Sequence, residues 1–450
     1  MRMLALVALR NLLQARRRTL FLGSAIASVS MLLVLLLALS SGVRRSFVES
    51  AGAITTGHVN VGGFFKVTPS SALPVLTEKQ ALREVVDEVS SEFEVDRIVE
   101  RHRGMSRVVS ATNSTRSTVV SGIDVAQEEE LLRFLQLAAP SEYQDGGGDA
   151  VEGDLARVSE PGSVILFVNQ AKHLGVGVGD VVTVRSDAMG AVVNTIDLEV
   201  VAVARDVGLL TNWTVFTSHD SVMELFRLRP GTTGAFQLYL EDPERAAEVA
   251  GRLREAFSER GFELLDHQAK PYFWKFGSVS ADDWVGQRLD LTTWRDEVSY
   301  LTWILQAIDV IAASLIFVLL AIMAIGIMNT MMMATRERTQ EIGTLRAIGM
   351  GKAPVLAMVL AEAAMLGLAA SLVGALLGGA ISVGLDTAQI RLPSDALRDV
   401  LLSDVIAMRS GVGHIGMAVG FLTTFTVLSA IWPAARAARL QPVTAMQEVT

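Results

Sequence analysis

The chain has 450 residues, half of them hydrophobic, and a mean hydropathy of +0.40, which is too apolar for an ordinary soluble protein. It contains no cysteine, which excludes disulfides, thiolate metal sites and a cysteine nucleophile. The net charge of −9 is unevenly spread: segment 44–302 has 25 basic and 39 acidic residues, whereas segments 1–18, 335–353 and 434–450 together have eleven basic and three acidic ones. Because basic flanks remain cytoplasmic and long acidic domains are translocated, this pattern predicts which parts lie outside.

Residues 1–18 are predicted to form a short amphipathic helix on the cytoplasmic membrane surface. Apolar residues such as Leu4 and Leu12 can face lipid while Arg10 reaches headgroups. A cleavable signal peptide is the alternative, but no small-residue cleavage site follows clearly, which favours an uncleaved anchor. Residues 19–43 are uncharged and exceed the roughly 20 residues that span a bilayer core, so they predict a first spanning helix.

Segment 44–302 predicts a large α+β domain outside the membrane, with at least two subdomains. Short runs rich in β-branched residues predict strands near 58–61, 106–111, 163–168, 180–186 and 198–204. Longer periodic stretches predict helices near 77–90, 124–136 and 242–257. The glycine-rich stretch 175–180 lacks the strand-then-helix context of a nucleotide-binding loop, and it predicts a turn entering a strand.

A second apolar helix is predicted at 303–334, running from outside to inside. With the preceding two residues it is about 50 Å long at about 1.5 Å per residue, against a hydrocarbon core of about 30 Å. The extra length requires the helix to tilt or to project beyond the membrane. A projecting end would make a stalk continuous with the outer domain. Asp309 lies in the outer portion, either as a wet interfacial carboxylate or with a role in transport.

The polar segment 335–353 follows on the cytoplasmic side. Thr335 is a candidate N-cap, Gly349 is suited to end a helix, and Pro354 opens the next one. Helical spacing places four residues on one face: Ile342, Leu345, Ile348 and Gly349. The pattern is compatible with a basic polar turn and also with a short helix presented to a soluble partner.

Two further spans complete the membrane part, at 354–385 and 411–433. An outer loop at 386–410 joins them, and a tail at 434–450 follows, so four spans leave both termini inside. Gly374 and Gly378 stand in the G-x-x-x-G spacing that permits close helix approach.

Two ionisable residues in these last spans have no assigned role. Glu362, near a cytoplasmic end, could face the bundle or snorkel to the interface. His414, near the outer interface, has no partner residues spaced for a metal site.

The string RERTQEIGTLRAIGM at 336–350 resembles the most recognisable motif of the FtsX/MacB superfamily of ABC transporter permeases. The basic, proline-containing tail after the last span is also similar to that family. In the family this loop is the coupling helix that docks on the ATPase subunit. The resemblance therefore implies an ATPase-coupling role for Arg338, Glu341, Ile342, Leu345, Arg346 and Gly349.

Four segments of the outer domain resemble Lol-type lipoprotein-releasing permeases in the same order, at 57–61, 121–132, 169–184 and 216–226. The resemblance implies extraction of acylated lipoproteins from the outer leaflet of the bacterial inner membrane, with the large domain in the periplasm. Acyl chains need an apolar groove, for which the candidates are Leu35, Leu36, Leu39, Ser40, Val43, Val310 and Phe317. Ordinary lipid-facing or packing side chains are the alternative for each of them.

The same resemblance implies two copies of a separate ABC ATPase and a second permease chain, identical or paralogous. The 450 residues contain no G-x-x-x-x-G-K-[ST], H-E-x-x-H or G-x-S-x-G motif, so we expect no catalytic site, metal, cofactor or nucleic-acid partner in this chain. ATP and Mg²⁺ would be bound by the partner ATPase. At 187–195 the sequence has a short turn where the carrier-recruiting Lol permease has a longer hook, which leaves recruitment of a periplasmic carrier open.

Two other functions fit the superfamily. One is a MacB-like mechanotransmission efflux permease, although such chains usually carry their ATPase in the same polypeptide. The other is an FtsX-like regulator of a cell-wall hydrolase, for which an outer domain spanning 44–302 is large.

Overall fold

The computed structural model describes residues 16–69, 71–187, 193–392, 394, 397–398, 401–403 and 405–439. Residues 1–15 of the predicted amphipathic helix and residues 440–450 of the tail lie outside the described residues. The chain divides into two compact units. The helical unit comprises Met1–Arg44, Leu305–Arg391 and Val405–Thr450, and the sheet unit comprises Arg45–Ile304 and Leu392–Asp404.

The helical unit contains long apolar helices, and the prediction of four membrane spans is confirmed. Among the described residues, four helices are long and apolar enough to cross a membrane. They are α2 (Arg16–Ala51), α11 (Thr302–Glu337), α13 (Lys352–Thr387) and α15 (Val412–Ala438). Helices α2 and α11 also contribute residues to the sheet unit.

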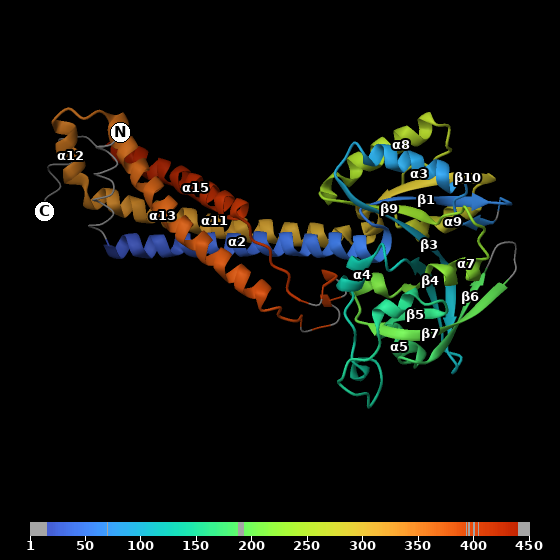
Figure 1. The fold of residues 1–450 in the computed structure, drawn as a ribbon. Coiled ribbons are helices and arrows are strands. Elements are labelled where there is room, and N and C mark those ends of the chain that lie inside the picture. Colours follow the sequence, from blue (N-terminus) through green and yellow to red (C-terminus); the bar gives the residue numbers. More distant parts are fainter. Residues whose placement is uncertain are drawn as a thin grey trace. The chain divides into compact units, whose positions relative to one another are not determined.

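Small residues allow the helices of this unit to approach closely. A Cβ added at Gly374 would lie 2.0 Å from the carbonyl oxygen of Ala27, and one added at Gly378 would lie 2.8 Å from that of Met31. The predicted G-x-x-x-G face of α13 therefore packs directly on the backbone of α2. Helices α13 and α15 run side by side (Figure 1). Leu22, Ile26, Ile327, Ala363 and Leu422 belong to the shared apolar core.

The sheet unit is built on one extended sheet with strand order β10-β1-β9-β3-β4-β8-β5-β7-β6. Its first half consists of β1 (Val59–Lys66), β9 (Ala235–Leu240), β10 (Gly286–Thr293) and the start of β3 (Val95–Val109). Strand β2 (Ala72–Leu73) pairs with β1. Helices α3 (Lys79–Ser90) and α8 (Ala246–Glu259) contact each other, and α8 packs on β1 and β10.

The second half of the sheet closes on itself. Its strands are the end of β3, then β4 (Thr115–Ile123), β8 (Thr214–Ser218), β5 (Ser163–Phe167), β7 (Val193–Ala204) and β6 (Val181–Asp187). Strand β6 pairs back with β3, so these six strands form a closed ring around a valine-rich core. β-Branched side chains pack well on such pleated, buried surfaces. Strand β3 is therefore shared, pairing with β9 in the first half and with β4 and β6 in the second.

Shorter helices complete the sheet unit. Helix α5 (Val168–Leu174) follows β5, and α7 (His219–Phe226) follows β8. Helix α4 (Glu129–Phe134) covers only part of the predicted helix at 124–136. The earlier residues form a turn in which the carboxylate of Asp124 accepts from the backbone N–H of Ala126 at 3.0 Å, and a helix cannot begin until that turn ends.

Most of the predicted α+β pattern is confirmed. The five predicted strands lie in β1, β3, β5, β6 and β7, and the glycine-rich stretch forms a turn before β6, with Gly175 and Gly179 at positive φ. Strands β6 and β7 pair as far as Asp187 with Val193, and residues 188–192 of the predicted short turn lie outside the described residues.

Candidate functional site

The predicted coupling segment contains one short helix, α12 (Thr339–Ala347), between α11 and α13. The prediction that Thr335 caps it was wrong. Thr335 lies inside α11, where its hydroxyl donates to the carbonyl of Met332 at 2.9 Å. The chain changes direction at Arg338, which has φ −106° and ψ 18°.

A glycine-based motif ends α12. Gly349 has φ +105°, which side chains other than glycine rarely adopt. Its N–H donates to the carbonyl of Arg346 at 3.1 Å, and the N–H of Met350 donates to the carbonyl of Leu345 at 3.0 Å. This pair of bonds is a Schellman motif, and it satisfies carbonyls that the helix end would leave free. Gly349 therefore sets the exit direction of the chain towards α13.

The inner face of α12 packs on the helical unit. Ile342 is 3% exposed and lies in an apolar cluster with Val355, Ala437 and Ala438. The predicted apolar face is correct for Ile342 and partly for the half-buried Leu345. It is wrong for Ile348, which is 80% exposed, because that residue follows the last residue of α12, where the backbone turns.

An ion pair fixes the beginning of the coupling segment. Nη1 of Arg338 lies 3.2 Å from Oε2 of Glu362, and the two side chains are 18% and 7% exposed. Glu362 therefore faces the interior of the helical unit, and of its two predicted alternatives snorkelling is wrong. The pair connects the start of α12 to α13.

A second arginine fixes the other end. Nη1 of Arg346 donates to the carbonyl oxygen of Ala438 at 2.9 Å. Ala438 is the last residue of α15, where helix carbonyls have no partner in their own helix and carry partial negative charge. Arg338, Ile342 and Arg346 thus hold the segment in place. Among the predicted coupling residues within α12, Glu341 alone is exposed.

Polar contacts also join the spans at their other ends. Oγ of Ser40 in α2 donates to Oδ1 of Asp309 in α11 at 2.8 Å, and Nη2 of Arg44 lies 3.5 Å from Oδ2. Oγ of Ser41 lies 3.2 Å from Nε2 of His414 in α15. Sequence reasoning identified Asp309 and His414 as isolated polar residues but found neither partner, since the partners lie 269 and 373 residues away.

The seven predicted groove residues lie in different surroundings. Val310 and Phe317 are 63% and 73% exposed on α11, whereas Val43 is buried. Leu35, Leu36 and Leu39 are half-buried, and Ser40 is bonded to Asp309. The exposed pair and Val43 do not share one open surface of this chain, so the groove stays a prediction.

Several known proteins are similar to this chain in sequence. A family model described as FtsX-like permease C-terminal matches residues 313–442, which include α12 with its anchors and the last two spans. The chain is 31% identical over 144 residues to the macrolide export ATP-binding/permease protein MacB of Bdellovibrio bacteriovorus, covering 32% of this chain and 20% of that protein. It is 25% identical over 290 residues to MacB of Agrobacterium fabrum, covering 64% and 36%.

A third relative is the pyoverdine export ATP-binding/permease protein PvdT of Pseudomonas savastanoi, which is 32% identical over 139 residues, covering 31% of this chain and 19% of that protein. The matches thus span between 19% and 36% of these relatives.

Two solved structures are also similar, each at 12% identity. The extracellular domain of the transporter YknZ from Gram-positive bacteria gives a TM-score of 0.28, covering 45% of this chain and 95% of that chain. The periplasmic region of MacB from Actinobacillus actinomycetemcomitans gives 0.30, covering 56% and 96%.

The family model covers the segment in which the anchored helix and its contacts were found, and the MacB-type relatives extend the likeness to further parts of the sequence. Residues 313–442 thus match the FtsX-like permease C-terminal family, and the chain is similar to MacB-type ATP-binding/permease proteins over up to 64% of its length.

Proposed function

We propose that this chain is the permease subunit of an ABC transporter of the inner membrane, driven by an ATPase that docks on α12 from the cytoplasm. The observation that carries the proposal is the two-sided character of α12. Its inner side is fixed by Ile342, Arg338 and Arg346, while Gln340, Glu341 and Thr344 are exposed. A helix whose inner side is fixed to neighbouring helices can transmit to them a force that is applied to its exposed side.

The contacts of α12 suggest how that push would spread. The Arg338–Glu362 pair and the Ile342–Val355 packing connect α12 to α13, and the Arg346–Ala438 bond connects it to α15. Helix α11 ends one residue before α12 begins. A displacement of α12 would therefore move three helices together, as expected of rigid-body transmission through a packed element. Since α2 and α11 contain residues of both units, their backbones would carry the motion onward.

The proposed cargo is an acylated lipoprotein, taken from the outer leaflet and released to the periplasm. The similarity of four ordered segments to Lol-type permeases supports this cargo, and so does the large exposed apolar surface of α11, which includes Val310 and Phe317. A second candidate is MacB-like export of a small molecule, which is favoured by the export functions named for the MacB and PvdT relatives.

Affinity purification of the tagged full chain from native membranes tests the proposal. We expect a nucleotide-hydrolysing subunit to copurify with the wild type and to be lost with Glu341→Lys. The control is Glu259→Lys, which reverses the same charge at an exposed site on α8 in the sheet unit. Recovery of acylated proteins supports lipoprotein release, whereas raised drug sensitivity of a deletion strain supports export. If no such subunit copurifies with the wild type, the proposal is wrong.

A further inference from the structure

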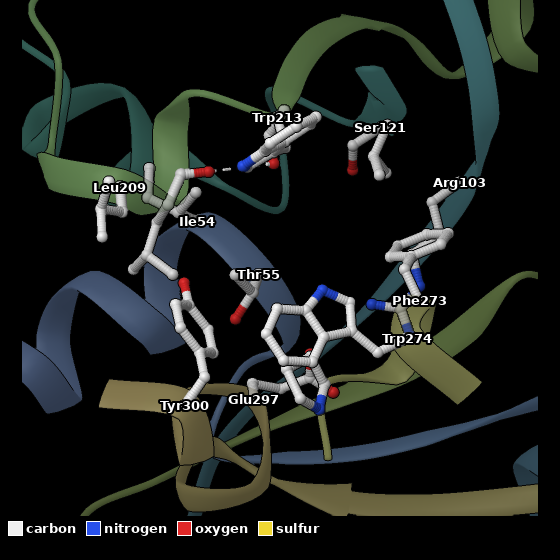
Figure 2. Close-up of a pocket in the computed structure, with 14 residues that line it drawn as sticks. Ile54, Thr55, Arg103, Ser121, Leu209, Trp213, Phe273, Trp274, Glu297 and Tyr300 are labelled. Carbon is white, nitrogen blue, oxygen red and sulfur yellow. Dashed lines mark hydrogen bonds between the residues drawn. The ribbon is translucent and has the colours of Figure 1, made fainter. Parts of the chain in front are cut away.

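A pocket of about 190 Å³ is formed by residues of the sheet unit, and none of its lining residues belongs to α12 or to its anchors. It is lined by residues that directly follow α2, namely Ile54 and Thr55, and by Tyr300, which lies just before α11. The remaining walls come from β3, β4, the segment leading into β8, the short helix at Tyr272–Lys275 with the preceding Pro271, and Glu297. Figure 2 shows four aromatic side chains around this space: Trp213, Phe273, Trp274 and Tyr300.

Two tryptophans of the pocket are unusually exposed. Trp213 is 61% exposed and Trp274 is 62% exposed. The ring of Trp274 lies 5.0 Å from that of Tyr300, so it is supported on one side by another aromatic ring. Exposed large apolar side chains that converge on a hollow commonly mark a ligand site. These rings offer flat apolar faces to a ligand body.

The inner wall carries a buried cation. Arg103 is only 4% exposed, and its Nη2 donates to Oδ1 of Asn60 at 2.9 Å. Its guanidinium carbon lies 4.1 Å from the centre of the Tyr272 ring and 5.4 Å from that of Phe273. Its Nε is buried and has no hydrogen-bond partner among the described residues. A buried guanidinium without a full set of partners is costly, and its charge favours an anion in the adjoining pocket.

The other ionisable group of the pocket differs from Arg103. Both carboxylate oxygens of Glu297 accept from the N–H of Tyr272 at 3.1 Å, and Oε1 also accepts from Thr292 at 3.1 Å. Burial raises the pKa of Glu297 to about 7, against the opposing effect of Arg103. Glu297 is thus already bonded and only partly ionised at neutral pH, and it does not supply the partner that Arg103 lacks.

We propose that this pocket binds an apolar carboxylate, with its aromatic or acyl body between Trp213 and Trp274 and its carboxylate at Arg103. One guanidinium suits a single negative charge, and the neighbouring Glu297 would disfavour a dianion such as a phosphate monoester. The small volume suits a body of one or two rings or a short acyl segment. The inference goes beyond the proposed function, since neither the ATPase nor the transported cargo enters it.

Calorimetric titration of the full chain in lipid nanodiscs tests the site, with empty nanodiscs subtracted. The probe is 1-naphthoate, and the matched cation is 1-naphthylmethylammonium. We expect the anion to bind at least tenfold more tightly than the cation. Trp274→Ala should weaken naphthoate binding about fivefold, as loss of an aromatic contact predicts. The control is Trp303→Ala, which removes an equally exposed tryptophan outside the pocket lining and should change nothing.

Arg103→Met should abolish the preference for the anion. Arg103→Lys should retain part of it, because lysine keeps the positive charge but replaces the planar guanidinium and its paired N–H donors with a single ammonium group. Trp274 is exposed, so its variant remains informative if an Arg103 variant fails to fold. Competition then identifies the source of the ligand: displacement of naphthoate by dodecanoate indicates a membrane-derived acid, and displacement by indole-3-acetate alone indicates a soluble aromatic acid. Equal binding of anion and cation, an unchanged Trp274→Ala variant, or failure of both competitors would overturn the proposal.

Discussion

Nη1 of Arg338 lies 3.2 Å from Oε2 of Glu362, although the two residues are 24 positions apart and belong to different segments. Arg338 stands between α11 and α12, and Glu362 lies within α13. One ion pair therefore joins the segment between α11 and α12 to the body of α13.

Removing Glu362 should destabilise the helical unit. Glu362→Gln keeps the size of the side chain but deletes the countercharge of Arg338, and breaking a mostly buried pair costs about 3 to 5 kcal/mol, an upper value for a site that is partly solvated. Arg338→Met combined with Glu362→Gln should recover part of the loss. Thermal unfolding of the purified full chain measures both. A double variant no more stable than Glu362→Gln alone would show that the pair does not act as a unit.

Glu341 and Arg346 should respond differently to substitution. Glu341→Lys changes an exposed residue, so we expect stability within about 0.5 kcal/mol of the wild type but loss of ATP-coupled work. Arg346→Ala deletes the bond to Ala438. It should lower the free energy of unfolding by about 1 to 3 kcal/mol and also reduce ATP-coupled work. Unfolding and nucleotide hydrolysis of the complex are the two measurements. Full coupling in both variants would contradict the assignment of α12.

The glycine that ends α12 should be intolerant of a side chain. Gly349→Ala places a Cβ at φ +105°, and strain of this kind costs about 1 to 3 kcal/mol. Nothing lies within 4 Å of the added Cβ, so the cost would come from the backbone alone. Gly351→Ala is the matched control, because Gly351 has φ −65° and its Cβ would lie 3.6 Å from Pro354. Equal unfolding temperatures for the two variants would contradict the Schellman assignment.

The stability of the sheet unit should decrease as pH rises through neutrality. Burial raises the pKa of Glu297 from 4.5 to about 7, so the folded chain holds this proton more tightly than the unfolded chain. The contribution is therefore fully present below pH 4.5 and lost as pH rises through about 7. The contribution of Glu297 to the free energy of unfolding is on the order of 1 to 3 kcal/mol.

Glu297→Gln, which cannot ionise, should flatten this dependence, and Glu263→Gln at an exposed site should leave it unchanged. Hydrogen exchange of β10 in the full chain at several pH values reports the opening free energy. The same slope in Glu297→Gln and wild type would exclude Glu297 as its cause.

The proposed orientation can be tested by labelling, because the chain has no cysteine of its own. Ser258→Cys is exposed on α8 of the sheet unit, and Gln340→Cys is exposed on α12. In intact spheroplasts an impermeant maleimide should react with the first and reach the second only after permeabilisation. The reverse order would invert the topology.

The sequence predicted the elements that depend on local pattern. Apolar length located the four spans, and the positive φ of Gly349 agrees with its predicted place at a helix end. The ends of α12 were less predictable, since the helical pattern of α11 continues past Thr335 and the turn at Arg338 depends on its contact with Glu362.

The sequence pattern did not predict contacts between residues that lie far apart in the chain. Arg101 and Glu128 form an ion pair whose side chains are 0% and 2% exposed, although both residue types are usually on the surface. Lys275 and Asp290 form another, with Nζ 2.8 Å from Oδ1. The pocket around Arg103 was missed for the same reason, because its lining residues come from six separate segments of the chain. Arg103 is one of four arginines in β3, so its residue type alone did not indicate a pocket.

Strand β3 has a consequence for any attempt to dissect this protein. Its fifteen residues, Val95–Val109, pair first with β9 and then with β4 and β6. A cut between the two halves of the sheet would have to break an uninterrupted peptide backbone in mid-strand, so neither half can be produced as an intact fragment. A tensile load on one half would likewise reach the other through covalent bonds, without a flexible linker to absorb it.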